Sequence, residues 1–461
     1  MNKCNISEKI REQITAKAGL VGLGVKVRQL GILKPIEGEV KIAQKTVKYT
    51  PHEKLTDALI AIVSGAAGLV EVNKRVRSDS ALQLAFGRTG CAEQSVVQDT
   101  LDACTGKNVA QMQLAVDKIL QQHSQVARHD YDKDYLLIEV DMTGRPCGRK
   151  AEFASKGYFA KQRNRRGRQE GYVVASQYEE IVIKRIYDGT TQLNTAFQPL
   201  MEAAQQALNL TAEQRARTIL RVDSGAGSVD DVNWALEQGY QFHGKDYSGR
   251  RAENLAESVT EWFTDPQDAN RQIGWVTESC ELYKRPVKRI AVRCRKNNGQ
   301  WGIGVILSTL SARAVLILTG QSPHQESDPL AVLLAYVRFY DQRGGGVEIE
   351  IKEDKQGFSM TKRNKKRFAA QQMVCLLEAL AHNLLVWARQ WLAPLCPNFA
   401  RFGIMRMVRD VLHITGIVTS DERRNIQKIV LNSADPFARH IYPGLADLLA
   451  REHVVVCLGE I

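Results

Sequence analysis

Two aspartates close apolar segments of the sequence in the same way. Asp141 follows "YLLIEV" and Asp223 follows "ARTILRV", and each leads into a glycine-bearing loop, "DMTG" or "DSGAG". Catalytic side chains often lie where a strand of a rigid sheet ends. If the two strands are neighbours, the aspartate backbones lie about 5 Å apart. Carboxylates that close raise each other's pKa unless a cation lies between them, and Mg²⁺ or Mn²⁺ suits such oxygen ligands.

Each aspartate also has an ordinary structural interpretation. An aspartate after a strand is commonly a turn residue or a helix N-cap. The segment "DSGAGS" lacks the G-K-[ST] of a phosphate loop, and no His/Asp pattern accompanies its serines, so neither a phosphate loop nor a serine nucleophile is favoured. A metal site therefore needs support from a third acid.

The candidate third acid lies in "FYDQRGGGVEIEIKEDKQGF", residues 339–358. The alternation of Glu and Ile indicates a half-buried strand. Glu348, Lys352 and Lys355, however, fall on one face of a helix. Ordinary Glu–Lys pairs on a solvated helix face would give the same pattern. The segment by itself leaves both structures open.

The order of the acids resembles that of a known family. Two strand-end aspartates, a β-rich stretch and a glutamate that opens a helix resemble the ribonuclease-H-like site of DDE transposases of bacterial insertion sequences, in the branch with a Y-R-E-K motif. Here the motif reads Tyr340, Arg343, Glu348 and Lys355, with four residues rather than three between Arg343 and Glu348. The extra residue falls in a Gly-Gly-Gly run, where an insertion costs little. The interval from Glu348 to Lys355 is unchanged, which favours Glu348 over Glu350.

The resemblance implies a fold and a chemistry. The fold is an α/β, ribonuclease-H-like mixed sheet flanked by helices, interrupted by a β-rich insertion, with a helical N-terminal DNA-binding region. Asp141, Asp223 and Glu348 would be catalytic and would hold two Mg²⁺ or Mn²⁺ ions. Tyr340, Arg343 and Lys355 would hold DNA phosphates. The segment around Glu348 is then a helix.

The implied activity is cut-and-paste DNA transposition. It comprises binding of terminal inverted repeats, metal-dependent phosphodiester cleavage and strand transfer into target DNA, by a protein that is a homodimer on double-stranded DNA. One alternative is a ribonuclease-H-like structure-selective endonuclease or junction resolvase. Another is a catalytically silent, transposase-derived DNA-binding protein.

The elements that must position the acids follow in order along the chain. We expect a helical DNA-binding region (1–130), the first part of the catalytic core (131–246), a β-rich insertion (247–334), the last part of the core with the glutamate helix (335–400), and a C-terminal region (401–461) with a hairpin around "TSDERRN". Strands are expected in the insertion at "RQIGWVTESCELY", "KRIAVRCRK", "GQWGIGVILSTL" and "ARAVLILTG". In the first region, "SDSALQLAFGRTGCAEQSVVQDTLDAC" indicates two short helices around a turn, an outline shared by helix-turn-helix motifs and by any helical hairpin.

Basic residues and tryptophans gather near the expected site. The net charge of +12 is moderate, but three basic runs flank the acids, at 161–171, 284–296 and 361–368. The candidate DNA contacts in the first two runs are Arg163, Arg165, Arg166, Lys288 and Arg289. The insertion also carries Trp262, Trp275 and Trp301. The resemblance implies that a tryptophan there stacks on a flipped base, with Trp275 the first candidate and Trp301 the second; filling a small β core is the alternative.

The cysteines and the apolar segments indicate the cellular compartment in which the protein is expected. The nine cysteines form no C-x-x-C pair, which predicts a reducing compartment and no zinc site. The start of the chain has no apolar signal-peptide core, and the apolar run at 58–70 is too short to span a bilayer. We therefore expect a soluble, cytoplasmic, nucleoid-associated bacterial protein with no membrane partner.

Overall fold

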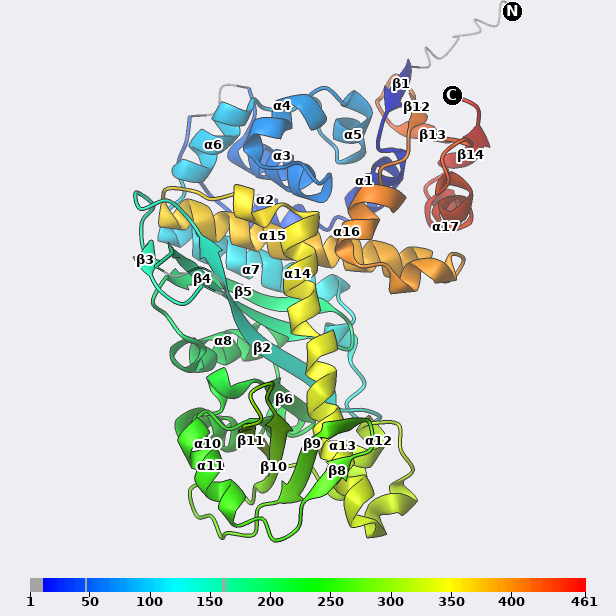
Figure 1. Ribbon diagram of the computed structural model, residues 1–461. Helices are drawn as coiled ribbons and strands as arrows, with labels where there is room; N and C mark the ends of the chain where they lie inside the picture. The colour runs from blue at the N-terminus through cyan, green and yellow to red at the C-terminus, as the bar shows by residue number, and fades with distance from the viewer. Residues whose placement is uncertain (1–10, 46–47, 160–161, 163) are drawn as a thin grey trace, which may run out of the picture. The chain divides into compact units, whose positions relative to one another are not determined.

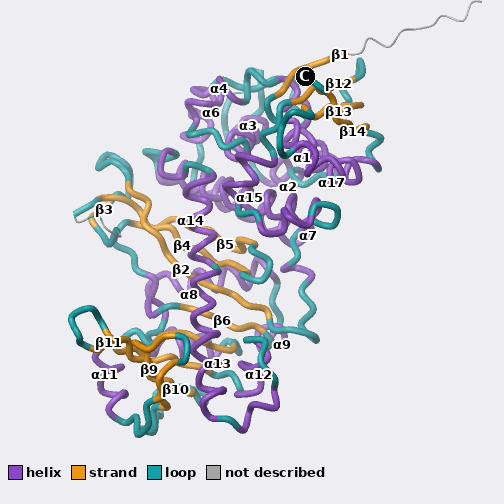
Figure 2. Tube along the Cα trace, turned by 45° about the vertical axis from the view of Figure 1, so that its right-hand side comes forward, coloured by secondary structure: helices purple, strands orange, loops and turns teal. Residues whose placement is uncertain are grey.

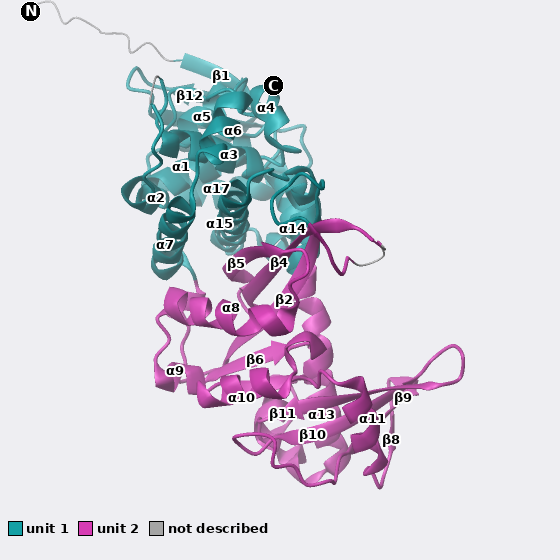
Figure 3. Cartoon of the chain, turned by 90° about the vertical axis from the view of Figure 1, so that its left-hand side faces the viewer, with its two compact units in different colours: residues 1–124, 146–154, 350–461 teal, residues 125–145, 155–349 magenta. Residues whose placement is uncertain are grey.

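The structure is a computed structural model that describes residues 11–461 apart from 46–47, 160–161 and 163. The chain forms two compact units (Figure 3). Unit 1 comprises residues 1–124, 146–154 and 350–461, and unit 2 comprises residues 125–145 and 155–349. The expected insertion, residues 247–334, falls in unit 2 with most of residues 131–246, and unit 2 ends at residue 349.

Unit 2 is built on a ten-stranded sheet. Five strands form its core in the order β5-β4-β2-β6-β7, with β5 antiparallel to β4 and with β2, β6 and β7 mutually parallel. They are β2 (Leu136–Pro146), β4 (Arg166–Ala175), β5 (Glu180–Asp188), β6 (Thr218–Val222) and β7 (Gln241–Lys245), and the short β3 (Ser155–Lys156) pairs with the start of β4. This strand order and direction is that of the ribonuclease-H-like fold, as expected.

The insertion continues this sheet. Its strands are β8 (Phe263–Asp265), β9 (Asp268–Trp275), β10 (Lys288–Arg295) and β11 (Trp301–Ser308). They form an antiparallel meander, and β11 pairs with β7 of the core. The insertion therefore adds strands to the catalytic sheet and does not form a separate β module.

One strand expected in the insertion is wrong. The segment "ARAVLILTG" forms helix α12 (Ala312–Leu318). The Ser311 side chain accepts a hydrogen bond from the Ala314 N–H and caps the helix, and Gly320, with φ +71°, follows its end. A second helix, α11 (Gly249–Glu257), begins the insertion. These local start and stop signals outweigh the β-branched composition.

Helices cover both faces of the unit 2 sheet (Figures 1 and 2). Helix α8 (Leu193–Leu208) packs on β4 and β5, and α10 (Val229–Glu237) packs on β7. Helix α13 (Pro329–Asp341) packs on β9, β10 and β11. Its apolar face joins one buried cluster with the strands, which includes Ile219, Ile273, Ile290, Ile306, Leu333, Tyr336 and Phe339. This cluster packs α13 against the sheet, and Arg221 of β6 donates a 2.9 Å bond to the Phe339 carbonyl near the end of α13.

Unit 1 is mainly helical and encloses α15 (Phe368–Leu392). Helices α3 (Pro51–Val63), α6 (Gln94–Asp102), α7 (Gly106–His123) and α17 (Ala438–Ala450) contact α15. Helix α15 is long and apolar enough to cross a membrane, but 89% of its most apolar window is buried in the protein, as in the core helix of a globular unit. The two short helices expected in the N-terminal region are α5 (Ser80–Ala85) and α6.

A second, four-stranded sheet lies in unit 1. Its order is β1 (Arg11–Thr15), β12 (Gly416–Ser420), β13 (Ile426–Asn432) and β14 (Val455–Gly459). Strands β12 and β13 form the hairpin that was expected around "TSDERRN". The pairing of β1 with β12 joins the N-terminal and C-terminal regions of the chain in one sheet of unit 1.

The ambiguous segment after the three glycines is helix α14 (Val347–Gly357). Its buried positions are Val347, Glu350, Ile351, Asp354 and Gly357, which recur with the period of a helix. Ile349 is exposed, which a half-buried strand would not allow. The Glu–Ile alternation is therefore misleading, as the resemblance implied.

Candidate active site

The two aspartates lie on adjacent parallel strands. The register pairs Val140 of β2 with Val222 of β6, so Asp141 and Asp223 come next on the two chains. Strand β6 ends at Val222, but β2 continues to Pro146 because β4 lies on its other side. The expectation that the strand ends at Asp141 is therefore wrong, whereas the expected proximity of the two acids is confirmed.

Asp223 also caps the turn that follows β6. Its Oδ1 accepts a 2.8 Å hydrogen bond from the Gly225 N–H, at the start of the short 3₁₀ turn Ser224–Ala226. On β2, Asp141 Oδ1 accepts a 2.7 Å bond from the Met142 N–H. The Asp223 carboxylate is thus oriented by the turn that follows β6, and the Asp141 carboxylate by the backbone of β2 itself, which reduces the entropy lost when they bind a ligand.

An arginine, Arg343, contacts both the third acid, Glu348, and one of the two aspartates, Asp141. Arg343 lies in the 3₁₀ turn before α14, and its Nη1 donates a 2.8 Å hydrogen bond to Glu348 Oε1. Its Nη2 lies 3.1 Å from Asp141 Oδ2. The Arg343 side chain is 6% exposed, whereas that of Glu348 is 54% exposed. Glu350, by contrast, is buried in unit 1, where its Oε2 lies 3.5 Å from Nε2 of His382.

The electrostatics show that these acids form one cluster. Burial raises the pKa of Asp141 to about 6; Arg343 opposes this rise, while Asp223 and Glu348 add to it. Burial alone would lower the pKa of Arg343, but the charges of Asp141, Asp223 and Glu348 outweigh it, and the pKa is raised. Asp141 and Glu348 therefore contact one buried guanidinium, and the charge of Asp223 also acts on it.

The chemistry of this donor set fits a divalent metal ion. All three side chains offer carboxylate oxygens, the ligands that hard cations prefer. Burial is the main cause of the raised pKa of Asp141, and the charges of Asp223 and Glu348 add to it; a divalent cation among the oxygens would stabilise the ionised carboxylates. Asp141, Asp223 and Glu348 are the residues that would hold it.

The remaining motif residues flank this cluster in the sequence. Tyr340 is half-buried at the end of α13, and burial raises the pKa of its hydroxyl to about 12; Arg343 opposes the rise, and Asp223 and Glu348 add to it. The hydroxyl therefore stays protonated and can donate a hydrogen bond. Lys355 lies in the last turn of α14, about two turns after Glu348.

A buried ion pair that the sequence reading missed lies directly below the aspartates. Glu139 on β2 and Arg221 on β6 are direct partners across the two strands, each two residues before its aspartate. Arg221 Nε donates a 2.6 Å hydrogen bond to Glu139 Oε1. The signal in the sequence is a charged residue at this place in each apolar strand, in "IEVD" and in "LRVD".

The basic candidates have varied surroundings. Arg165 and Arg166 are exposed at the start of β4, and Arg163 lies outside the described residues. Lys288 is exposed, and its Nζ donates a 3.2 Å bond to the Leu310 carbonyl. Arg289 is buried and donates to the Glu278 carbonyl, which gives it a structural contact.

The basic run at 361–368 is partly structural. Arg363 is buried in unit 1, where its Nε donates a 2.8 Å bond to the Phe358 carbonyl. Lys365 is also buried, and its Nζ donates a 2.7 Å bond to Gln98 Oε1. Clustering of positive charge in the sequence therefore does not by itself place that charge on a surface.

The tryptophans of the insertion also differ in how deeply their side chains are buried. Trp275 is half-buried against the α13 cluster, with its ring edge-on to Tyr336 at 5.7 Å between centroids. Trp301 is 37% exposed. The Arg293 guanidinium lies 4.8 Å from the Trp301 ring centroid and 4.0 Å from that of Trp262, so a cation lies against both indoles.

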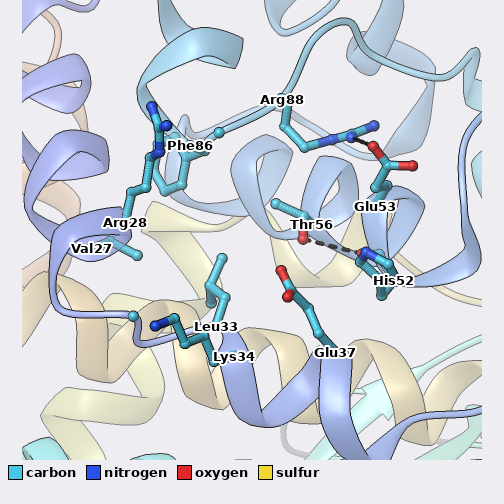
Figure 4. Close-up of a pocket in the computed structure, with 12 residues that line it drawn as sticks. Val27, Arg28, Leu33, Lys34, Glu37, His52, Glu53, Thr56, Phe86 and Arg88 are labelled. Atoms are coloured by element: carbon cyan, nitrogen blue, oxygen red, sulfur yellow. Dashed lines mark hydrogen bonds and ion pairs between the residues drawn. The ribbon is translucent and has the colours of Figure 1, made fainter. Parts of the chain in front are cut away.

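Each unit also contains a pocket. In unit 2, a pocket of about 500 Å³ is lined by Lys245, Lys296, Arg271, Trp301, Tyr340 and Asp341. In unit 1, a pocket of about 290 Å³ lies among N-terminal helices (Figure 4). Arg88 at its rim pairs with Glu53 and Asp57, and the Thr56 hydroxyl donates a 3.1 Å bond to the His52 carbonyl. Tyr340, whose hydroxyl is influenced by the charges of the acid cluster, thus also lines the unit 2 pocket.

The fold and the three-carboxylate cluster define a DDE-type, ribonuclease-H-like enzyme. The model of the family described as transposase DDE domain group 1 matches residues 8–451, and the chain belongs to this family of transposases. Among solved structures, the chain is similar to a cryo-EM structure of the piggyBac transposase synaptic complex with hairpin DNA. That similarity has 11% identity and a TM-score of 0.45, and it covers 88% of this chain and 82% of the other. No match was found among curated proteins.

Proposed function

We propose that this protein is the transposase of a bacterial insertion sequence that moves by cut-and-paste transposition. It would bind the terminal inverted repeats, cleave the DNA at them and join the freed 3′ ends to target DNA. The observation that carries the proposal is the convergence of Asp141, Asp223 and Glu348, from two strands and one helix, around Arg343.

We infer the roles of the residues from the family resemblance, and their positions near the acid cluster support these roles. When bound, two Mg²⁺ or Mn²⁺ ions supply activation of the attacking water or 3′-hydroxyl and stabilisation of the leaving oxygen. Asp141, Asp223 and Glu348 would together hold these ions. The Tyr340 hydroxyl donates to a DNA phosphate oxygen. Arg343 and Lys355 supply positive charge to the same strand.

Double-stranded DNA is the proposed partner, bound by a homodimer in the bacterial cytoplasm. The helical N-terminal region supports end recognition, because a structure-selective nuclease or resolvase needs no such region. A catalytically silent derivative is disfavoured since all three acids are present and converge. Terminal inverted repeats on either side of the coding sequence would separate a transposase from a nuclease.

The decisive experiment uses DNA ends taken from those flanks. The Asp141→Asn protein should bind the end DNA with the affinity of the unmodified protein and cleave it at an undetectable rate in Mg²⁺ or Mn²⁺. The isosteric amide removes the charge needed to hold the cation and keeps the side-chain volume. Cleavage by this variant at the full rate would overturn the assignment of the site.

A further inference from the structure

The buried pair of Glu139 and Arg221 contacts every element that carries a candidate catalytic acid. Glu139 lies on β2 with Asp141, and Arg221 lies on β6 with Asp223. Side chains two residues apart on a strand point to the same face, so the pair lies about 7 Å below the two aspartates. Both side chains are almost fully buried.

The pair extends to the helix that carries the third acid. Glu139 Oε2 accepts a 2.7 Å hydrogen bond from the backbone N–H of Val347, the first residue of α14 and the neighbour of Glu348. Arg221 Nη1 donates a 2.9 Å bond to the Phe339 carbonyl near the end of α13. The first N–H groups of a helix lack intrahelical partners, so a carboxylate that accepts from one fixes where the helix begins.

The last of the three glycines makes this contact possible. A Cβ at Gly346 would collide with Oε2 of Glu139, whereas Cβ atoms at Gly344 and Gly345 would meet open space. Oε2 cannot simply move away, because the Val347 N–H and Arg221 hold the carboxylate in a buried site. Of the three glycines, only Gly346 therefore has to lack a side chain, because the Glu139 carboxylate lies against its Cα.

We propose that the Glu139–Arg221 pair is a positioning device that sets the three carboxylates at their mutual distances. The proposal rests on the proposed function and adds to it two residues that touch neither metal nor DNA. A buried ion pair is seldom more stabilising than apolar residues of the same size. The geometry that this pair imposes on β2, β6 and α14 is what apolar residues could not supply.

A double replacement separates positioning from stability. In Glu139→Leu/Arg221→Met, apolar side chains of similar size replace the pair, and the folded protein should melt only modestly below the unmodified protein, because the Val347 N–H and the Phe339 carbonyl lose their partners. Hydrogen exchange at the Val347 amide should be faster because its acceptor is gone. Cleavage of end DNA should fall about 100-fold, the effect of misplacing a reacting group by about 1 Å. The Mn²⁺ concentration for half-maximal cleavage should rise, with DNA affinity unchanged.

A matched control tests whether the loss of any buried ion pair changes the exchange at Val347 and the Mn²⁺ requirement. Asp265 in the same unit is fully buried and accepts bonds from Arg271 and Arg338, away from β2, β6 and α14. Asp265→Asn should lower the melting temperature and leave exchange at Val347 and the Mn²⁺ requirement unchanged. The same Mn²⁺ shift in both variants would show a structural role only and overturn the proposal.

The glycine run gives an independent test that keeps every charge. Gly346→Ala should displace the Glu139 carboxylate, speed exchange at Val347 and slow cleavage, whereas Gly344→Ala and Gly345→Ala should match the unmodified protein. If the Glu139→Leu/Arg221→Met protein does not fold, the comparison of the three alanine variants tests the proposal in its place. Equal exchange in all three alanine variants overturns the proposal. A protein that fails to cleave any end DNA refutes the proposed function, and the exchange at Val347 still decides the role of the pair.

Discussion

Nη1 of Arg343 donates a 2.8 Å hydrogen bond to Oε1 of Glu348, five residues further along the chain. Since Nη2 of the same guanidinium lies 3.1 Å from Asp141 Oδ2, one buried cation links two candidate ligands that come from a strand and a helix. Arg343 therefore balances the acid cluster from within the protein, in addition to any role on DNA.

The first prediction concerns the stability of the cluster without metal. Arg343→Gln should lower the free energy of unfolding in EDTA by about 3 kcal/mol, the low end for removing one partner of a buried pair, because Glu348 is half-exposed. Added Mg²⁺ should then stabilise the variant more than it stabilises the unmodified protein. Thermal unfolding with and without Mg²⁺ measures both quantities. An equal Mg²⁺ effect in the two proteins would contradict the shared-cation interpretation.

A second prediction separates the two neighbouring glutamates. Glu348→Gln should abolish cleavage of end DNA, and Glu350→Gln should retain it, because Glu350 faces His382 within unit 1. Glu350→Gln should nevertheless lower stability by about 1–3 kcal/mol, since it weakens a buried charged contact. Single-turnover cleavage, normalised to the folded fraction, compares them. Activity in Glu348→Gln together with inactivity in a folded Glu350→Gln would reverse the assignment.

The third prediction concerns the tryptophans as base-stacking platforms. With 2-aminopurine at the penultimate base of the transposon end, binding of the unmodified protein should change the fluorescence, and Trp275→Ala should not give this change. Because Trp275 packs against Tyr336, Trp275→Ala should also cost about 2–4 kcal/mol of stability, whereas the exposed Trp301→Ala should cost about 1 kcal/mol or less. A folded Trp275→Ala protein with the full fluorescence change and normal cleavage would assign that indole to packing alone.

A fourth prediction follows from His243, which is fully buried beside Ser308, with its Nδ1 3.1 Å from the Ser308 hydroxyl. Burial, helped by the charge of Arg221, lowers the pKa of the ring to about 3, whereas the unfolded chain takes up the proton near the ordinary value of 6.5. Between about pH 3 and pH 6.5, the His243 ring binds a proton in the unfolded chain but not in the folded protein. The contribution of the neutral ring to the free energy of unfolding is therefore fully present above pH 6.5 and decreases as the pH is lowered. The slope is about 1.4 kcal/mol per pH unit.

The variant His243→Gln isolates this effect. Below pH 6, the free energy of unfolding of the unmodified protein should decrease relative to that of the variant with that slope. Urea unfolding of both proteins at several pH values between 7 and 5 provides the comparison. A difference that is independent of pH would show that the ring is protonated in the folded protein as readily as in the unfolded chain.

Much of the catalytic sheet could be predicted because its signals are local. An apolar strand that ends at an aspartate, as at Asp223, is visible in the local sequence. The helix around Glu348 was implied by the family resemblance instead, because the local Glu–Ile alternation indicates a strand. The pairing of β7 with β11 could not be predicted, because it depends on partners far apart in the sequence. The same holds for Arg363 and Arg289, whose positive charges turn inward to backbone carbonyls in the folded protein.

The pairing of β11 with β7 has a consequence for how the chain tolerates deletion. In a shortened chain without residues 247–334, β7 would end the sheet and expose a row of N–H and C=O groups that now bond to Ile306, Leu307 and Ser308. An exposed strand of this kind is a template for pairing with other chains, and the loss would promote aggregation. The insertion therefore protects the solubility of the catalytic unit. Because β11 must cover the edge of β7, the sequence of the insertion is constrained even at positions whose side chains never contact DNA.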